Sequence, residues 1–103
     1  MINENKFNED VKKYLSTMYD EDNIFWHEND LKLYKIYKDI EESDIPVLIN
    51  IYNTNDDVFI KYYSAALLFK LKYPNSRSFL ESLKKEKKVG GMVTLLLAAH
   101  KDR

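Results

Sequence analysis

The segment from Ser43 to Ser76 constrains the fold most, because proline punctuates it at both ends. It reads SDIPVLINIYNTNDDVFIKYYSAALLFKLKYPNS. Pro46 is tolerated only in the first turn of a helix, and the residue before Pro74 is pushed away from helical geometry. The polar run Asn53 to Asp56 separates two apolar stretches, as turn residues do. The segment therefore predicts a short helix, a polar turn and a longer helix that pack as a pair.

The longer helix, from about Asp57 to Lys72, should lie at the centre of the fold. Its apolar residues cover more than half of the helix circumference, and such a helix lies between two layers. Small residues at Ser64, Ala65 and Ala66 would let a neighbouring helix approach closely. We therefore expect this helix to be the most buried in the chain, with Ala65 facing a neighbour.

Four further helices are expected from apolar residues spaced three and four apart. One stripe lies near the N-terminus, a second precedes Ser43, a third follows Pro74, and a last helix follows the Gly90-Gly91 pair. The stripe residues are Phe7, Val11, Tyr14, Leu15 and Met18, then Leu33, Tyr34, Tyr37 and Ile40, then Phe79, Leu80 and Leu83, and finally Met92 to His100. No alternating strand pattern is visible. The sequence predicts one all-α domain, residues 1–103, of five or six helices in stacked antiparallel pairs.

Polar residues suited to helix N-caps precede five of the expected helices. The candidates, in chain order, are Asn3 or Asn5, Asn29 or Asp30, Asp44, Asp56 or Asp57, and Asn75 or Ser76. The last helix is expected to dock against the central one.

Composition excludes several classes of protein. The chain has no cysteine, so disulfides, thiolate metal sites and a cysteine nucleophile are excluded. The N-terminus has no apolar run typical of a signal peptide, and even the longest uninterrupted apolar stretches, such as Leu95 to Ala99, are far shorter than the roughly 20 residues of a membrane span. We expect a cytoplasmic protein with no membrane contact.

The segment that begins at Asp44-Ile-Pro46 resembles a HEAT repeat. It has the early proline, acidic residues in the turn, and Ile60-Lys61 where those repeats usually have Val-Arg, ahead of small residues and leucines. Lys cannot form the planar donor fork that Arg supplies. The whole chain is similar to the bacterial domain-of-unknown-function family 2019, through its acidic N-terminal part, its Ala-rich helix, Pro74, Arg77 and Leu80-Glu81, and a Gly-containing last helix. The resemblance implies a HEAT-like α-α superhelix and carries no activity.

Candidate reactive groups are few. His27 lies beside Glu28, and His100 lies far from it in the sequence, so surface or capping roles explain both better than a metal pair or a general base. The acidic cluster Asp20 to Asp22 lacks the alternating oxygens and glycine of a calcium loop. We expect no catalytic residue, no cofactor and no metal.

Two features that suggest anion binding are also weak. The Gly90-Gly91 pair follows lysines, as in some phosphate-binding loops. It lacks the Gly-Lys-Ser/Thr ending of such a loop and the strand that precedes it. The basic run Lys84 to Lys88 belongs to a chain of pI about 6.1, half of which is acidic and would repel nucleic acid. We expect no nucleic-acid partner.

Charge is divided unevenly along the chain. Residues 1–57 hold fourteen Asp or Glu and six Lys, a net of −8, whereas residues 58–103 hold three acids and ten Lys or Arg, a net of +7. We expect another protein to bind the acidic part, steered by charge and anchored by aromatic rings. The candidate residues are Asp20, Glu21, Asp22, Trp26, Glu28, Asp30, Tyr34, Tyr37, Glu41 and Glu42.

Three alternatives stay open at this point. An immunity protein would use the same acidic face to neutralise a basic toxin. An enzyme, ranked below both kinds of binding protein, would need a pocket around His27 or His100. In the third alternative, Trp26 fills the gap between the first two helices, and the acidic residues only keep the protein soluble.

Overall fold

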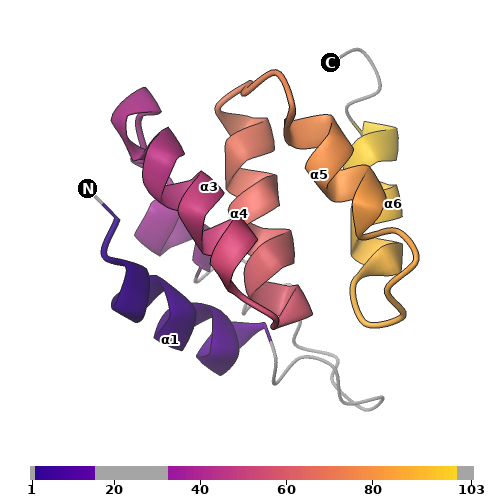
Figure 1. Cartoon of the computed structure of the whole chain (residues 1–103), viewed down its shortest axis with the longest axis horizontal. Helices are drawn as coiled ribbons and strands as arrows, with labels where there is room; N and C mark the ends of the chain where they lie inside the picture. The colour runs from indigo at the N-terminus through magenta and orange to yellow at the C-terminus, as the bar shows by residue number, and fades with distance from the viewer. Residues whose placement is uncertain (1, 16–32, 100–103) are drawn as a thin grey trace.

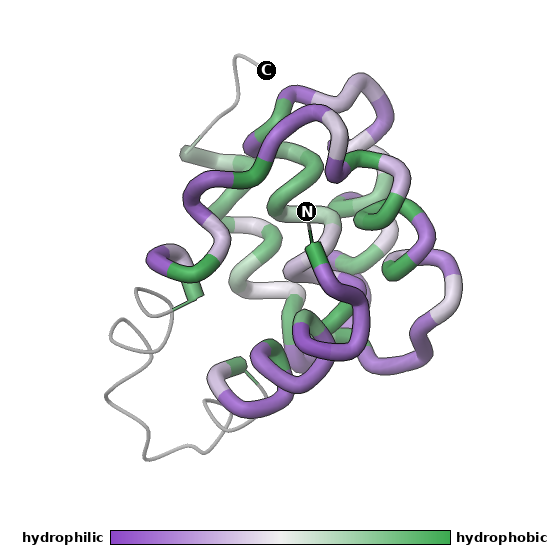
Figure 2. Tube along the Cα trace, turned by 90° about the vertical axis from the view of Figure 1, so that its left-hand side faces the viewer, coloured by the Kyte–Doolittle hydropathy of each residue, from purple (hydrophilic) through white to green (hydrophobic). Residues whose placement is uncertain are grey.

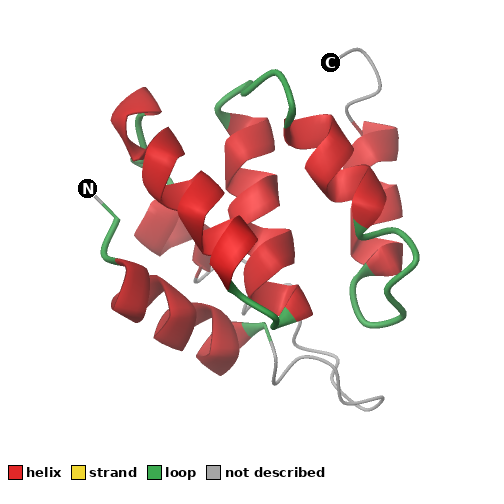
Figure 3. Ribbon diagram, in the orientation of Figure 1, coloured by secondary structure: helices red, strands yellow, loops and turns green. Residues whose placement is uncertain are grey.

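The computed structural model describes residues 2–15 and 33–99, and within these ranges the chain forms helices joined by loops, with no strand (Figures 1 and 3). This confirms the all-α prediction. A further helical segment covers residues 33–37. The other helices are α1 (Glu4–Tyr14), the 3-10 helix η2 (Glu42–Asp44), α3 (Ile45–Thr54), α4 (Val58–Lys70), α5 (Ser76–Ser82) and α6 (Gly90–Ala99).

Helix α4 is the centre of the fold, as predicted. It lies between α3 and α5 and also contacts α1 (Figure 1). Eight of its thirteen residues are buried, whereas α1, α3, α5 and α6 each have two. Ala65 is fully buried. The pair formed by α3 and α4 is the one predicted from the segment Ser43 to Ser76.

Two of the predicted N-caps are confirmed, and the structure chooses between the alternatives. The Asn3 side chain accepts a hydrogen bond from the Lys6 backbone N–H at 3.0 Å. The Asp57 carboxylate accepts from the backbone N–H groups of Phe59 and Ile60, at 2.8 and 3.2 Å. Both helices therefore begin where a side-chain oxygen satisfies their first free amides. The predicted cap of α5 is wrong, because Asn75 makes no side-chain capping bond and the Ser76 hydroxyl donates to the Tyr73 carbonyl at 2.7 Å. The predicted cap at Asn29 or Asp30 lies outside the described residues.

Asp44 does not cap α3 with its side chain, so that prediction is wrong. Pro46 stands at the second position of α3 and has no N–H to donate, which removes one of the two usual capping partners. The buried Asp44 carboxylate instead accepts from the backbone N–H groups of Glu41 and Ile2, each at 3.0 Å. It therefore ties the beginning of the chain to the beginning of α3.

Helix α4 ends just before the predicted break at Tyr73-Pro74. Lys72 has a φ of 61°, in the left-handed region. Its N–H donates to the carbonyl of Phe69, and the Tyr73 N–H donates to the carbonyl of Leu68, both at 3.0 Å. These two bonds form a Schellman motif, which satisfies the last carbonyls of the helix.

Gly90 and Gly91 belong to α6 and do not interrupt it, which differs from the expected start at Met92. The Gly90 N–H donates to the Glu86 carbonyl at 2.7 Å. A Cβ at Gly90 would lie 2.5 Å from the backbone oxygen of Lys84, so glycine permits a close approach of the two chain segments. Helix α6 packs more closely against α5 than against α4, the partner that the sequence predicts.

Candidate partner-binding surface

Four of the ten predicted partner-binding residues lie in the described ranges. Asp20, Glu21, Asp22, Trp26, Glu28 and Asp30 lie outside them, as do His27 and His100. Tyr34 and Tyr37 lie in helical segment 33–37, and Glu41 and Glu42 lie between this segment and α3.

Tyr34 is open to solvent and contacts a lysine. Its side chain is 51% exposed. The Lys70 Nζ, from the last turn of α4, lies 4.8 Å from the centroid of the Tyr34 ring and donates to the backbone carbonyl of Lys38 at 3.3 Å. An exposed tyrosine ring is the kind of residue that anchors a partner.

Tyr37 is not part of the exposed surface, and its predicted place there is corrected. It is only 7% exposed, and its hydroxyl donates to Asp10 Oδ2 at 2.8 Å. Its ring meets those of Phe7 and Tyr63 edge-on, with centroids 5.2 and 6.0 Å away. Burial, and then the hydrogen bond to Asp10, raise the pKa of Tyr37 well above its ordinary value. Tyr37 joins α1, segment 33–37 and α4.

A hollow of about 300 Å³ lies beside these residues, between the N-terminal segment and residues 36–44. Its apolar lining comes from Ile2, Ile36 and Ile40 with the edge of Tyr37, and Ile36 is 42% exposed. The Ile2 N–H is bound to Asp44, so the buried carboxylate described above also fixes one wall of the hollow. The remaining lining residues are Asn3, Lys6, Asp39 and Asp44.

The polar residues of the hollow differ in how strongly they are engaged. Lys6 is paired with Asp10 at 2.9 Å, and Asp44 accepts two backbone hydrogen bonds. Asp39 is exposed, as are Glu41 and Glu42 farther along the chain. The hollow therefore combines aliphatic side chains with an exposed carboxylate, which suits an apolar side chain that has a basic neighbour.

Charge on this part of the molecule is mixed. Lys35 and Lys38 are exposed in the same stretch as Asp39, Glu41 and Glu42. Figure 2 shows that hydrophilic residues predominate along α1, near the N-terminus, whereas hydrophobic residues are more frequent in the helices behind it. The described residues alone do not form a uniformly acidic face.

Ile2 and Ile36 were missed from the sequence, although Ile36 carried a signal. It lies off the stripe of Leu33 and Tyr37, both of which are buried. A branched apolar residue outside the buried stripe of an amphipathic helix is a candidate contact residue. Nothing in the sequence indicates that Ile2 lies next to it.

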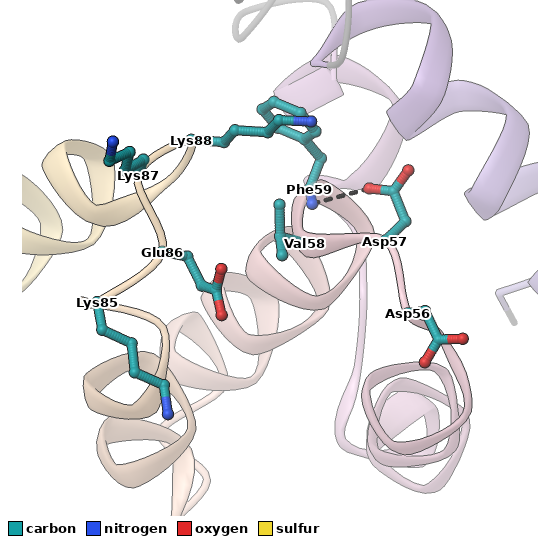
Figure 4. Close-up of a pocket in the computed structure, with 8 residues that line it drawn as sticks. All are labelled: Asp56, Asp57, Val58, Phe59, Lys85, Glu86, Lys87 and Lys88. Atoms are coloured by element: carbon teal, nitrogen blue, oxygen red, sulfur yellow. Dashed lines mark hydrogen bonds between the residues drawn. The ribbon is translucent and has the colours of Figure 1, made fainter.

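A second and larger groove, of about 810 Å³, lies between the beginning of α4 and the α5–α6 loop (Figure 4). Asp56, Asp57, Val58 and Phe59 line one wall, and Lys85 to Lys88 line the other. Acidic groups on one wall face a mainly basic wall, so the groove does not select a ligand of one sign. Asp57 is engaged as the cap of α4, and Figure 4 shows its bond to Phe59.

This groove does not support phosphate binding by the Gly90-Gly91 region. The first free amides of α4 already donate to Asp57, and the Gly90 amide donates to Glu86. A phosphate-binding loop needs such amides directed at the ligand.

Within residues 2–15 and 33–99, no group of three or more His, Asp or Glu side chains is arranged to hold a metal ion. No helix in the same ranges has the length and apolar character needed to cross a bilayer.

Comparison of the chain with protein-family models, with curated proteins and with solved structures found no match. The resemblance to HEAT repeats and to family 2019 stays a prediction.

Proposed function

We propose that this chain is a non-enzymatic interaction module of the cytoplasm, in which a HEAT-like stack of helices presents a surface to another protein. That surface, here called the N-terminal surface, consists of Tyr34, Ile36, Asp39, Glu41 and Glu42 together with the hollow lined by Ile2 and Ile40. Trp26 and the acidic residues between Asp20 and Asp30 belong to the same proposal.

One observation carries the proposal. An exposed Ile36 borders a hollow that Ile2 and Ile40 also line, and Tyr34, exposed two positions earlier in the same helical segment, contacts Lys70. Partner side chains that fill such a hollow are desolvated at the centre of a contact, where binding energy concentrates. The surrounding carboxylates would steer a partner with basic residues around an apolar anchor.

The pairing of α3 and α4 supports the HEAT-like part of the proposal. Lys61 stands where HEAT repeats usually have Arg, and it reaches across to α3 with one hydrogen bond to the Tyr52 carbonyl. The small residues Ser64 and Ala65 are fully buried between helices. A stack of this kind needs no reactive group to present a surface.

An immunity protein that neutralises a basic toxin is the second candidate. It would use the same surface, because Asp39, Glu41 and Glu42 are exposed there. Lys35 and Lys38 among them reduce the negative charge, so this candidate depends more strongly on the acidic residues outside the described ranges. A partner with a large excess of positive charge at the contact would favour it.

Site-specific photo-crosslinking tests the proposal. A benzophenone amino acid placed at Ile36 should capture a protein partner from an extract of the native host. The matched control places the same group at Ser78 of α5, which is also exposed but does not line the hollow. Equal capture from both positions, or capture from Ser78 alone, would contradict the assignment of the surface.

A further inference from the structure

Three charged side chains line the hollow beside Ile36, and two of them are already engaged. The Lys6 Nζ lies 2.9 Å from Asp10 Oδ2, and the Asp44 carboxylate accepts two backbone N–H groups. Asp39 is exposed, and its carboxylate makes no hydrogen bond or ion pair with any residue in the described ranges. The charge that the hollow leaves unpaired is therefore negative, which favours a cation beside it.

The rest of the hollow is mainly aliphatic. Ile36 is exposed, and Ile2 and Ile40 are half-buried against the core. The volume of the hollow is about 300 Å³. An apolar cavity of about 150 Å³ already holds a benzene molecule, so the hollow has room for one bulky apolar side chain.

Ile2 forms one wall of the hollow although it lies outside α1. The hydrogen bonds within α1 do not hold it, because that helix begins at Glu4. Its N–H donates instead to Asp44 Oδ1 at 3.0 Å, and Asp44 Oδ2 accepts from the Glu41 N–H. Asp44 is buried, so water does not compete freely for these two bonds. The position of the Ile2 wall is therefore tied to one buried carboxylate.

We propose that the hollow takes a bulky aliphatic side chain of a partner protein, that an arginine or lysine next to this side chain pairs with Asp39, and that Asp44 is a positioning residue that holds the Ile2 wall. This inference rests on the function proposed above and names the chemistry of the partner. Asp44 acts through Ile2 and does not itself pair with the partner, since both of its oxygens are engaged.

Three synthetic peptides, blocked at both ends, test the chemistry of the partner. They carry Leu-Arg, Leu-Glu or Gly-Arg between glycines. Titration of the full chain, followed through the methyl NMR signals of Ile2, Ile36 and Ile40, measures each dissociation constant.

The Leu-Arg peptide should bind most tightly. The Leu-Glu peptide should bind about three times more weakly, because an exposed ion pair contributes little. The Gly-Arg peptide should bind about ten times more weakly, because the aliphatic anchor is lost. Equal affinities for the three peptides, or no change in the isoleucine signals, would overturn the proposed chemistry.

Asp44→Asn tests the positioning role, with the Leu-Arg peptide as the probe. Asparagine keeps the size of the side chain but has one acceptor oxygen, and its NH2 group meets one of the two N–H groups. This variant should bind the peptide about five times more weakly, because the hollow is no longer preorganised. The matched control, Asp57→Ala, removes the N-cap of α4, which does not line the hollow, and should bind like wild type although it is less stable. An equal loss of affinity in both variants would overturn the positioning role.

A double-mutant cycle tests whether Asp44 acts through Ile2. Ile2→Ala shortens the wall and should bind the Leu-Arg peptide about five times more weakly. The double variant Asp44→Asn with Ile2→Ala should bind about as weakly as Ile2→Ala alone, since the wall that Asp44 holds is already lost. Losses that add in the double variant would show that Asp44 does not act through Ile2.

Photo-crosslinking at Ile36 keeps this inference distinguishable from the proposed function. Capture of a partner at Ile36, together with equal affinities for the three peptides, would overturn this inference and leave the proposed function standing. Selective binding of the Leu-Arg peptide without capture at Ile36 would contradict the proposed function instead.

Discussion

Lys61 of α4 donates a hydrogen bond to the backbone carbonyl of Tyr52 in α3, with 2.8 Å between the nitrogen and the oxygen. The same ammonium group lies 4.5 Å from the centroid of the Tyr52 ring. The hydroxyl of Tyr52 in turn lies 2.7 Å from the Ser82 hydroxyl of α5, and its ring stacks on Phe79. Lys61 and Tyr52 therefore join α3, α4 and α5.

Replacing Lys61 with Met should lower the free energy of unfolding by about 1–2 kcal/mol, because a charged donor is lost while the aliphatic stem is kept. Lys84→Met is the control, since Lys84 is exposed, and it should change the free energy by less than about 0.5 kcal/mol. Urea denaturation measures both. Equal values for the two variants would show that the Lys61 contact does not stabilise the helix pair.

Ala65→Leu should lower the free energy of unfolding by roughly 1–3 kcal/mol, because Ala65 is fully buried against neighbouring helices and extra methyl groups overpack the contact. Ala99→Leu, at the exposed end of α6, is the matched control and should be nearly neutral. A denaturation midpoint unchanged by Ala65→Leu would count against close packing at α4.

The two glycines of α6 should respond differently to alanine. Gly90→Ala places a methyl group against the Lys84 backbone carbonyl and should lower the free energy of unfolding by roughly 1–3 kcal/mol. Gly91→Ala meets open space and should be neutral, or stabilise by up to about 1 kcal/mol through helix propensity. Thermal denaturation at low protein concentration compares them. The reverse order would be incompatible with the close approach at Gly90.

Tyr37→Phe should lower the free energy of unfolding by about 0.5–1.5 kcal/mol at neutral pH, because the hydrogen bond to Asp10 is lost. Burial raises the pKa of Tyr37 above its ordinary 10.0 in the folded protein. A raised pKa favours the neutral form on folding, so this contribution is complete below about pH 10 and is lost as the pH rises further.

The difference in stability between wild type and Tyr37→Phe should therefore shrink between about pH 10 and pH 11, where unfolded tyrosine ionises. The other seven tyrosines titrate in both proteins, and subtraction removes their effect. Guanidinium denaturation across this range provides the measurement. A difference that stays constant would mean that Tyr37 is not held neutral in the folded state.

Local patterns were sufficient to predict most of the helices. Pro46, the polar turn and Pro74 marked the α3–α4 pair, and the apolar circumference of the second helix indicated its central place. These features are local because helix boundaries depend on backbone constraints and on spacing within a few residues. The predicted start of α6 at Met92 was wrong, because Gly90 allows a close approach to the Lys84 backbone that residue spacing does not reveal.

Contacts between distant residues were not predictable. The Asp44 carboxylate binds the N–H of Ile2, which lies 42 positions away in the chain. Tyr34 and Tyr37 share one expected stripe, but the tertiary position of α1 turns Tyr37 toward Asp10 and leaves Tyr34 outside. The hollow at Ile36 depends on both arrangements. The sequence therefore indicated the region around Tyr34 and Tyr37, but not that Ile2 and Ile36 line a hollow there.

Recovery of a partner from an extract of the native host, at low salt, tests most directly whether the N-terminal surface binds another protein. Four forms would be compared: wild type, Ile36→Asp, the double variant Glu41→Lys with Glu42→Lys, and the control Glu81→Lys, at an exposed position of α5. All should show the same circular dichroism spectrum. We predict that wild type and Glu81→Lys recover the same partner, that the double variant recovers less, and that Ile36→Asp recovers none. Equal recovery by all four forms would contradict the proposal that this surface binds the partner.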